Sequence, residues 1–106
     1  MMEIKTITPD EVKSKLENDE TLYLVDVRED EEVAEGKIPE AVHIRMGEIP
    51  EYLDFFDKEN EYIIICKAGG RSYKVCKYLM ANGYNNVVNM TGGMLAWTGE
   101  TKPKHS

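Results

Sequence analysis

One short segment of the sequence combines a sulfur nucleophile, two glycines, a hydroxyl and two cations. It runs from Cys66 through Lys67, Ala68, Gly69, Gly70 and Arg71 to Ser72. The apolar run from Tyr62 to Ile65 precedes it and predicts a buried strand. Residues 72–82 carry apolar side chains at helical spacing and end at a helix-stopping Asn-Gly pair. The cysteine is therefore predicted at the carboxyl end of a strand, where open α/β sheets bind their ligands.

A loop folded over a helix N-terminus favours negative charge. The first N–H groups of a helix have no partner inside it and carry partial positive charge. Gly69 and Gly70 allow positive φ, which turns further N–H groups inward and forms an anion-binding cradle. Arg71 and Lys67 add two positive charges. The segment is therefore expected to hold the pKa of Cys66 below the free value of about 8.5 and to receive an anionic substrate.

Simpler interpretations of the same residues stay open. A cysteine that ends a strand is often a small buried hydrophobic residue, and the glycines also suit an ordinary strand-to-helix turn. A Walker-type phosphate loop is excluded, because no Gly-Lys-Ser/Thr follows a glycine at the required spacing. Asp26 and Arg28 fit a structural charge pair better than an acid/base pair. Cys76 is expected in the core rather than as a resolving thiol, and His43 as a structural hydrogen-bonding residue.

Composition narrows the class of protein. The chain has 106 residues, of which 42% are hydrophobic and 31% charged, as is typical of one soluble domain. Its formal net charge of −7 argues against nucleic acid and anionic membrane surfaces as partners. The N-terminus lacks the apolar stretch of a signal peptide, so we expect a cytoplasmic protein. Two cysteines and two histidines at these spacings predict no zinc site, and we expect no cofactor.

Short strands alternate with helices along the chain. The predicted strands cover residues 4–7, 22–27, 41–44, 62–65 and 87–90. A capping box at Thr8 and Glu11 begins the first helix, and further helices are predicted at 28–36, 49–56, 72–82 and after Gly92-Gly93. This alternation predicts a parallel sheet covered by helices on both sides. We expect a single domain over residues 1–106, with its core at about 4–98 and a loose tail at 99–106.

Three segments together resemble the rhodanese-like, or sulfurtransferase, domain family. LVDVREDEEVAEGKIPEAVHI is similar to the family's D-V-R … G-H-I-P-G-A block, and IIICKAGGRS to its C-x-x-G-x-R-S loop. VNMTGGMLAW is similar to the closing L-x-G-G-x-x-x-W segment. The resemblance spans residues 4 to 98, with the motifs in the family's order. Lys37, Glu40 and Met90 depart from it, in segments expected to be structural.

The resemblance implies both a fold and a reaction. The fold is α/β and rhodanese-like, a five-stranded, mainly parallel sheet flanked by helices on both faces. The reaction is a double displacement, in which Cys66 takes a sulfane sulfur as a persulfide and passes it on. The backbone of residues 67–72 would cradle the transferred sulfur, and Arg71 would hold the loop and the anionic donor. Six residues from cysteine to arginine resemble the sulfurtransferases, whereas related phosphatases carry seven.

The predicted function is transfer of a sulfane sulfur from thiosulfate or a persulfide donor to a thiol or cyanide, through a persulfide on Cys66. The partners expected are thus a small anionic donor and a thiol or persulfide-bearing acceptor, which includes proteins. The alternative is a sulfur-relay carrier or protein-docking module with little turnover on small donors. Phosphatase activity or arsenate reduction is disfavoured by the length of the loop.

Overall fold

The fold is built on one parallel sheet whose strands all point toward the same edge. A computed structural model describes residues 3–104 of the chain. Five strands lie in the order β1-β5-β4-β2-β3 and every neighbouring pair is parallel. The strands are β1 (Lys5–Ile7), β2 (Tyr23–Asp26), β3 (Val42–His43), β4 (Tyr62–Ile65) and β5 (Val87–Met90). The predicted five-stranded α/β fold is therefore confirmed, and the sheet is parallel throughout rather than mainly parallel.

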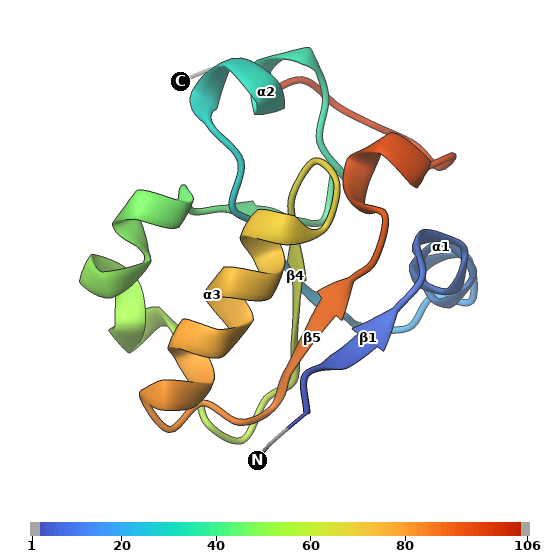
Figure 1. Cartoon of the computed structure of the whole chain (residues 1–106). Helices are drawn as coiled ribbons and strands as arrows, with labels where there is room; N and C mark the ends of the chain where they lie inside the picture. The colour runs from blue at the N-terminus through green and yellow to red at the C-terminus, as the bar shows by residue number, and fades with distance from the viewer. Residues whose placement is uncertain (1–2, 105–106) are drawn as a thin grey trace.

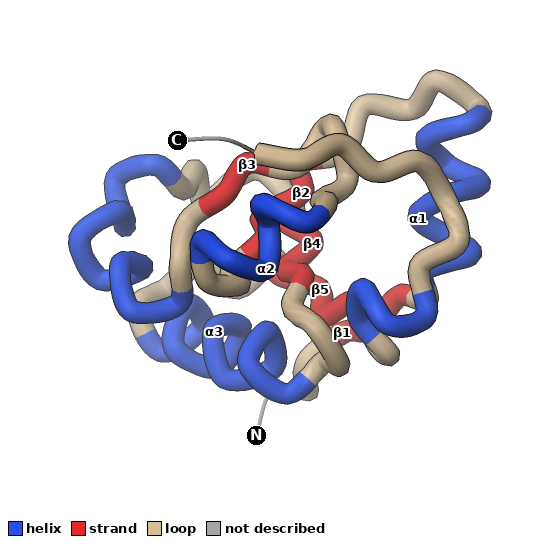
Figure 2. The backbone as a smooth tube through the Cα atoms, turned by 90° about the horizontal axis from the view of Figure 1, so that it is seen from above, coloured by secondary structure: helices blue, strands red, loops and turns tan. Residues whose placement is uncertain are grey.

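Helices cover both faces of this sheet. They are α1 (Pro9–Glu17), α2 (Asp30–Glu35) and α3 (Gly70–Ala81), with the 3₁₀ helices η1 (Met46–Phe55) and η2 (Gly93–Ala96). Helix α3 packs on one side with η1, while α1 lies on the other side (Figure 1). Seen from above, the strands run between these two layers, and α2 crosses over the edge where the strands end (Figure 2). Within residues 3–104, no helix is long and apolar enough to cross a bilayer.

Alternation along the central strand divides the core in two. Tyr62 and Ile64 of β4 belong to the cluster under α3 and η1, together with Cys66. Ile63 and Ile65 belong to the cluster on the α1 side. Successive side chains of a strand point to opposite faces, so a strand covered on both faces is apolar at every position. The continuous apolar run of β4 has this origin, and all four residues are buried.

The helix after the cysteine begins earlier than predicted. The sequence placed its start at Ser72, whereas α3 begins at Gly70 and has Gly69 as its N-cap. Gly69 adopts the left-handed conformation with φ of 106°, which a residue with a side chain rarely occupies. This turns the chain into the helix within a shorter loop. Arg71 and Ser72 consequently lie in the first turn, where helical N–H groups lack intrahelical partners.

Other boundaries also differ from the predictions. The capping box of Thr8 and Glu11 is confirmed. The helix predicted at 49–56 is a 3₁₀ helix from Met46 to Phe55 with non-helical angles at Tyr52. The predicted loose tail is wrong for residues 102–104. Lys102 exchanges two backbone hydrogen bonds with Lys37, and the Lys104 N–H donates to the Val33 carbonyl at 3.0 Å. The last two residues of that tail lie outside the described part of the chain.

Candidate active site

Cys66 lies immediately after the last residue of β4 and is almost completely enclosed. Only 1% of its surface is exposed, and it belongs to the apolar cluster beneath α3 and η1. The chain then passes through Lys67 and Ala68, both exposed, to the left-handed Gly69 and into α3. The predicted placement of Cys66 between a strand end and a helix start is thus confirmed. Its sulfur faces the inside of the loop.

The 3₁₀ helix η2 donates hydrogen bonds to the two carbonyl groups at the start of this loop. The Met94 N–H donates to the Cys66 carbonyl at 2.9 Å, and the Leu95 N–H donates to the Lys67 carbonyl at 3.0 Å. Gly93 makes this close approach possible, since a Cβ atom there would collide with both carbonyl oxygens. With these carbonyls fixed toward η2, the N–H groups that follow are free to turn toward the sulfur.

Hydrogen-bond donors surround the Cys66 sulfur. The Gly69 N–H donates to Sγ at 3.0 Å, and the Ser72 hydroxyl lies 3.2 Å from the same atom. Burial raises the pKa of the Cys66 thiol, but the Ser72 hydroxyl and the backbone N–H groups of Ser72, Gly69 and Ala68 outweigh it. The net result is a pKa lowered from the ordinary value of a thiol. Hydrogen bonds to the charged form of a group favour that form.

A further residue, Asn89 in β5, completes the polar network and was missed by the sequence analysis. The Ser72 hydroxyl donates to Asn89 Oδ1 at 2.5 Å, and Asn89 Nδ2 donates to the Gly69 carbonyl at 3.2 Å. Asn89 is 5% exposed and stands in an otherwise apolar strand, Val87–Met90. A buried amide in such a run needs hydrogen-bond partners. A lone polar residue in an apolar strand is the sequence signal by which Asn89 could have been found.

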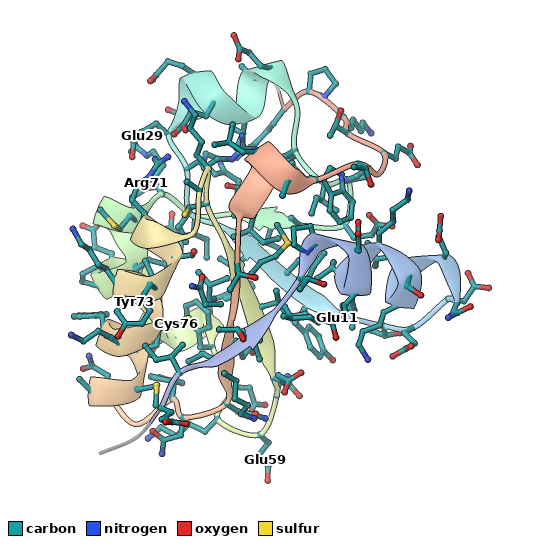
Figure 3. The ribbon with its side chains drawn as sticks, turned by 45° about the vertical axis from the view of Figure 1, so that its right-hand side comes forward. Glu11, Glu29, Glu59, Arg71, Tyr73 and Cys76 are labelled. Carbon is teal, nitrogen blue, oxygen red and sulfur yellow. The ribbon has the colours of Figure 1, made fainter. Side chains whose placement is uncertain are left out.

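Arg71 forms a paired contact with a carboxylate on another element. Its guanidinium donates to both oxygens of Glu32 on α2, at 2.7 and 2.8 Å. The hydrogen bonds from Arg71 lower the pKa of Glu32 to about 2, against the opposing effect of burial. Arg71 lies at the upper end of α3, close beneath α2 and Glu29 (Figure 3). The pair joins α2 to the first turn of α3, and sequence periodicity gave no signal for Glu32.

The other predicted polar residues have structural contacts. Arg28 binds both carboxylate oxygens of Asp26 in the interior and also donates to the Gly36 carbonyl at 2.8 Å. The interpretation of Asp26 and Arg28 as a charge pair is confirmed. His43 Nε2 lies 2.7 Å from the Arg28 carbonyl, as expected for a structural residue. These contacts fix the segment that leads into α2.

Cys76 lies deeper, on the inner side of α3. It is fully buried and not in a disulfide, and burial raises its pKa to about 12. Cys66 is likewise a free thiol, so the structure contains no bridge between the two. Among residues 3–104, no three His, Cys, Asp or Glu side chains come together as ligands for a metal ion.

A cleft opens beside the loop, with a volume of about 310 Å³. Its lining includes Lys67 of the loop, the η2 residues Met94 and Leu95, and Glu32 and Glu35 of α2. Leu95 is 70% exposed. The cleft gives the loop an open flank, whereas the sulfur itself is enclosed.

Comparison with known proteins identifies the family. The family described as "Rhodanese-like domain" matches residues 8–100, so the chain belongs to the rhodanese-like domain family. It is 62% identical over 104 residues to "Putative sulfurtransferase YtwF" of Bacillus subtilis (strain 168), covering 98% of this chain and 100% of that protein. A "Sulfurtransferase" of Allochromatium vinosum is 37% identical over 94 residues, covering 89% and 88% of the two chains.

A solved structure supports the same assignment. The crystal structure of a rhodanese-like domain protein from Staphylococcus aureus superimposes with a TM-score of 0.89 at 48% sequence identity. The match covers 96% of this chain and 100% of that one. The resemblance seen in the three sequence motifs is therefore confirmed for the whole fold.

Proposed function

We propose that the protein is a sulfurtransferase that carries a sulfane sulfur as a persulfide on Cys66. The observation that carries the proposal is the set of donors on the sulfur, from Gly69, Ser72 and the loop backbone, which lowers the pKa of the thiol. A thiolate is the reactive form of cysteine, and it needs no separate base. The relatives named as sulfurtransferases support the same class of reaction.

The reaction proceeds in two balanced displacements. The Cys66 thiolate attacks the outer sulfur of thiosulfate, the sulfur–sulfur bond of the donor breaks, and sulfite leaves with the bonding electron pair. The outer sulfur, now bonded to Cys66, carries the negative charge toward the N–H groups of residues 67–72. A thiol or cyanide then attacks this outer sulfur and restores the Cys66 thiolate. A protein or low-molecular-weight persulfide serves as donor in the same way, with a thiol leaving instead of sulfite.

Charges near the loop support an anionic donor. Lys67 lines the cleft beside the loop and is exposed. Glu32 lines the same cleft, but its charge is paired with Arg71. The fork of Arg71 is occupied by Glu32, so its contribution is to hold the loop against α2. We therefore assign attraction of the donor to Lys67 and the helix N-terminus, with Arg71 as a supporting charge.

Intact-mass measurement after incubation with thiosulfate tests this function. The expected result is a gain of one sulfur atom that is removed by cyanide, with thiocyanate as product. Cys66→Ala should abolish the gain, whereas the matched variant Cys76→Ala should retain it. A protein that gains no sulfur, or a gain that persists in Cys66→Ala, would refute the persulfide on Cys66.

A second function is favoured by one specific observation, the enclosure of Cys66. With 1% of its surface exposed, the sulfur is reached only if the loop opens or a partner rearranges it. A sulfur-relay carrier that exchanges sulfur with a protein would show such an arrangement. The two functions are separated by comparing the rate of sulfur uptake from thiosulfate with the rate from a persulfide-bearing cysteine desulfurase. Faster uptake from the protein donor, with negligible thiosulfate turnover, would select the carrier.

A further inference from the structure

The contacts of Asn89 fix which end of its amide faces Ser72. The Gly69 carbonyl only accepts hydrogen bonds, so the group that faces it at 3.2 Å must be the amide NH₂. The amide oxygen therefore faces the Ser72 hydroxyl at 2.5 Å. An amide oxygen is also only an acceptor, so Ser72 must donate to it. The orientation follows from the partners and does not depend on telling nitrogen from oxygen.

The Ser72 hydroxyl has one proton and two groups that compete for it. If the proton points to Asn89 Oδ1, the hydroxyl oxygen can only accept from Cys66, which is then a thiol donating its S–H. If Cys66 is a thiolate, the hydroxyl must turn its proton to the sulfur. The oxygens of Ser72 and Asn89 then face each other without a hydrogen atom between them. Ionisation of Cys66 therefore costs the hydrogen bond between Ser72 and Asn89.

We propose that Asn89 is a positioning residue that sets the direction of the Ser72 hydroxyl, taking its proton when the Cys66 sulfur is neutral and releasing it when that sulfur is charged. Asn89 touches neither the sulfur nor a substrate, so it acts through Ser72. The inference deepens the proposed sulfur transfer and, as regards turnover, rests on it.

The Ser72 hydroxyl points in a different direction in each covalent state of Cys66, toward the sulfur in the free thiolate and toward Asn89 in the persulfide. In the free thiolate the charge is on Cys66 Sγ, and the Ser72 proton stabilises it. In the persulfide Sγ is bonded to the outer sulfur and the charge has moved outward, so the hydroxyl can return to Asn89. Asn89 therefore opposes the thiolate and favours the persulfide. An excessively stable thiolate would be a weaker nucleophile, and Asn89 limits that stability.

Other ionisable groups near the sulfur are few among the described residues. Arg71 in the first turn of α3 senses the charge of Cys66, and so does Cys76 one and a half turns further along the helix. Lys67 is the adjacent residue in the loop. Arg71 is always charged and Cys76 stays protonated near neutral pH. Neither Arg71 nor Cys76 changes charge over the pH range in which Cys66 titrates. A shift in the titration of Cys66 caused by a change at Asn89 therefore reports the direction of the Ser72 hydroxyl.

The rate of alkylation of Cys66 by iodoacetamide, measured against pH, tests the proposal without any sulfur donor. Asn89→Leu removes the acceptor at similar size and frees Ser72 to donate to the sulfur at all times. The midpoint pH of the alkylation profile of Cys66 should fall by about half a pH unit to one pH unit, which corresponds to the free energy of one hydrogen bond. Ser72→Ala should raise the midpoint. The double variant should equal Ser72→Ala, because Asn89 acts only through that hydroxyl.

Opposite outcomes overturn the inference. A midpoint that rises in Asn89→Leu, or changes equally with and without the Ser72 hydroxyl, would mean that Asn89 merely holds the loop through Gly69. Asn86→Ala is the matched control and should leave the midpoint unchanged, because Asn86 is half-buried just before β5 and its side chain accepts a hydrogen bond from Lys5.

If Asn89→Leu fails to fold, Asn89→Asp answers the same question. A carboxylate retains the Ser72 proton more strongly, and its charge also opposes the thiolate, so the midpoint should rise for both reasons. The measurement that tests the switch is removal of the hydroxyl from this variant, which should add nothing. A further rise on removing the hydroxyl would refute the switch. Because alkylation needs no transferable sulfur, these results stand even if the protein takes up no sulfur from thiosulfate.

Discussion

The two cysteines of this protein lie ten positions apart and share one apolar cluster, yet they have opposite chemistry. Cys66 is 1% exposed and Cys76 is fully buried, so both are removed from solvent. The pKa of Cys76 is raised to about 12, whereas that of Cys66 is lowered. Cys76 lies well down α3, below Tyr73 and away from the end that carries Arg71 (Figure 3).

The difference between them comes from hydrogen-bond donors, since burial acts on both in the same direction. For Cys76 burial is the largest influence, with the charge of Cys66 adding to it. For Cys66 burial is also the largest single influence and raises the pKa, but four donors together reverse it. Within one core, then, the arrangement of the hydrogen-bond donors in the loop, the Ser72 hydroxyl and three backbone N–H groups, decides which sulfur is a nucleophile. Changes to that arrangement should make the two thiols more alike.

The largest expected effect is the difference in alkylation between the two thiols of the native protein. At pH 7, Cys66 should react at least ~1,000-fold faster than Cys76, because the thiolate fraction falls tenfold for each unit by which a pKa exceeds the pH. Iodoacetamide labelling followed by peptide mapping measures both rates in one sample. In denaturant the difference should disappear, and comparable labelling of Cys76 in the native state would contradict the comparison.

A smaller but still large effect is expected from Gly93→Ala. The added Cβ atom collides with the carbonyls of Cys66 and Lys67, and the residue has φ of 57°. The loop must shift, which moves its N–H groups away from the sulfur. Sulfur uptake should fall roughly 10- to 100-fold, as misplacement of a catalytic group by about 1 Å does. The alkylation midpoint of Cys66 should also rise toward the free value of about 8.5.

Gly47→Ala is the matched control for this variant. A Cβ atom at Gly47 meets nothing within 4 Å, and the residue is not in the left-handed region. Normal uptake in Gly93→Ala would show that the contact of η2 with the loop does not position the sulfur.

Cys76→Ala should lower the stability of the protein and leave the reactivity of Cys66 unchanged. The variant removes a fully buried sulfur and leaves a small void beneath α3, so the free energy of unfolding should fall by about 1–2 kcal/mol. The reactivity of Cys66 should be retained, because Cys76 donates nothing to it. Urea unfolding and the alkylation assay on the same preparation measure the two effects. A large loss of Cys66 reactivity would mean that the two thiols are coupled.

The order of elements and the position of Cys66 were predictable from the sequence because they depend on local patterns. The apolar run Tyr62–Ile65 and the capping box of Thr8 follow from residues close together in the chain. The start of α3 was misplaced because the left-handed conformation of Gly69 depends on its packing beside the backbone of residues 90–92. A glycine permits such a conformation but does not require it.

The parts of the site that sequence analysis missed are contacts between distant segments. Asn89 reaches Ser72 across 17 positions, and Glu32 reaches Arg71 across 39. Glu32 lies among other acidic residues at 29–35, and no local feature of the sequence distinguishes it from them as the partner of Arg71. A single polar residue in an apolar strand was the only local sign of Asn89. Pairing partners at such separations are set by the packing of the sheet.

The smallest expected effect concerns the ion pair that holds the loop from outside. Glu32→Gln removes the charge paired with Arg71 and should lower the free energy of unfolding at pH 7 by about 1 kcal/mol. The value is modest because the side chains of Arg71 and Glu32 are 30% and 26% exposed, so solvent screens their interaction. The matched control is Glu31→Gln, an exposed neighbour on α2.

The stability difference between wild type and Glu32→Gln should depend on pH in a direction set by the pKa of Glu32. The pKa of Glu32 is lowered from 4.5 to about 2, so its stabilisation is fully present above 4.5 and is lost as the pH falls through about 2. The difference between wild type and Glu32→Gln should therefore shrink between pH 4.5 and pH 2, whereas Glu31→Gln should show no such trend. Urea unfolding at pH 7, 5 and about 3 measures it. A constant difference would mean that the amide disturbs packing and that Arg71 gains nothing from the charge.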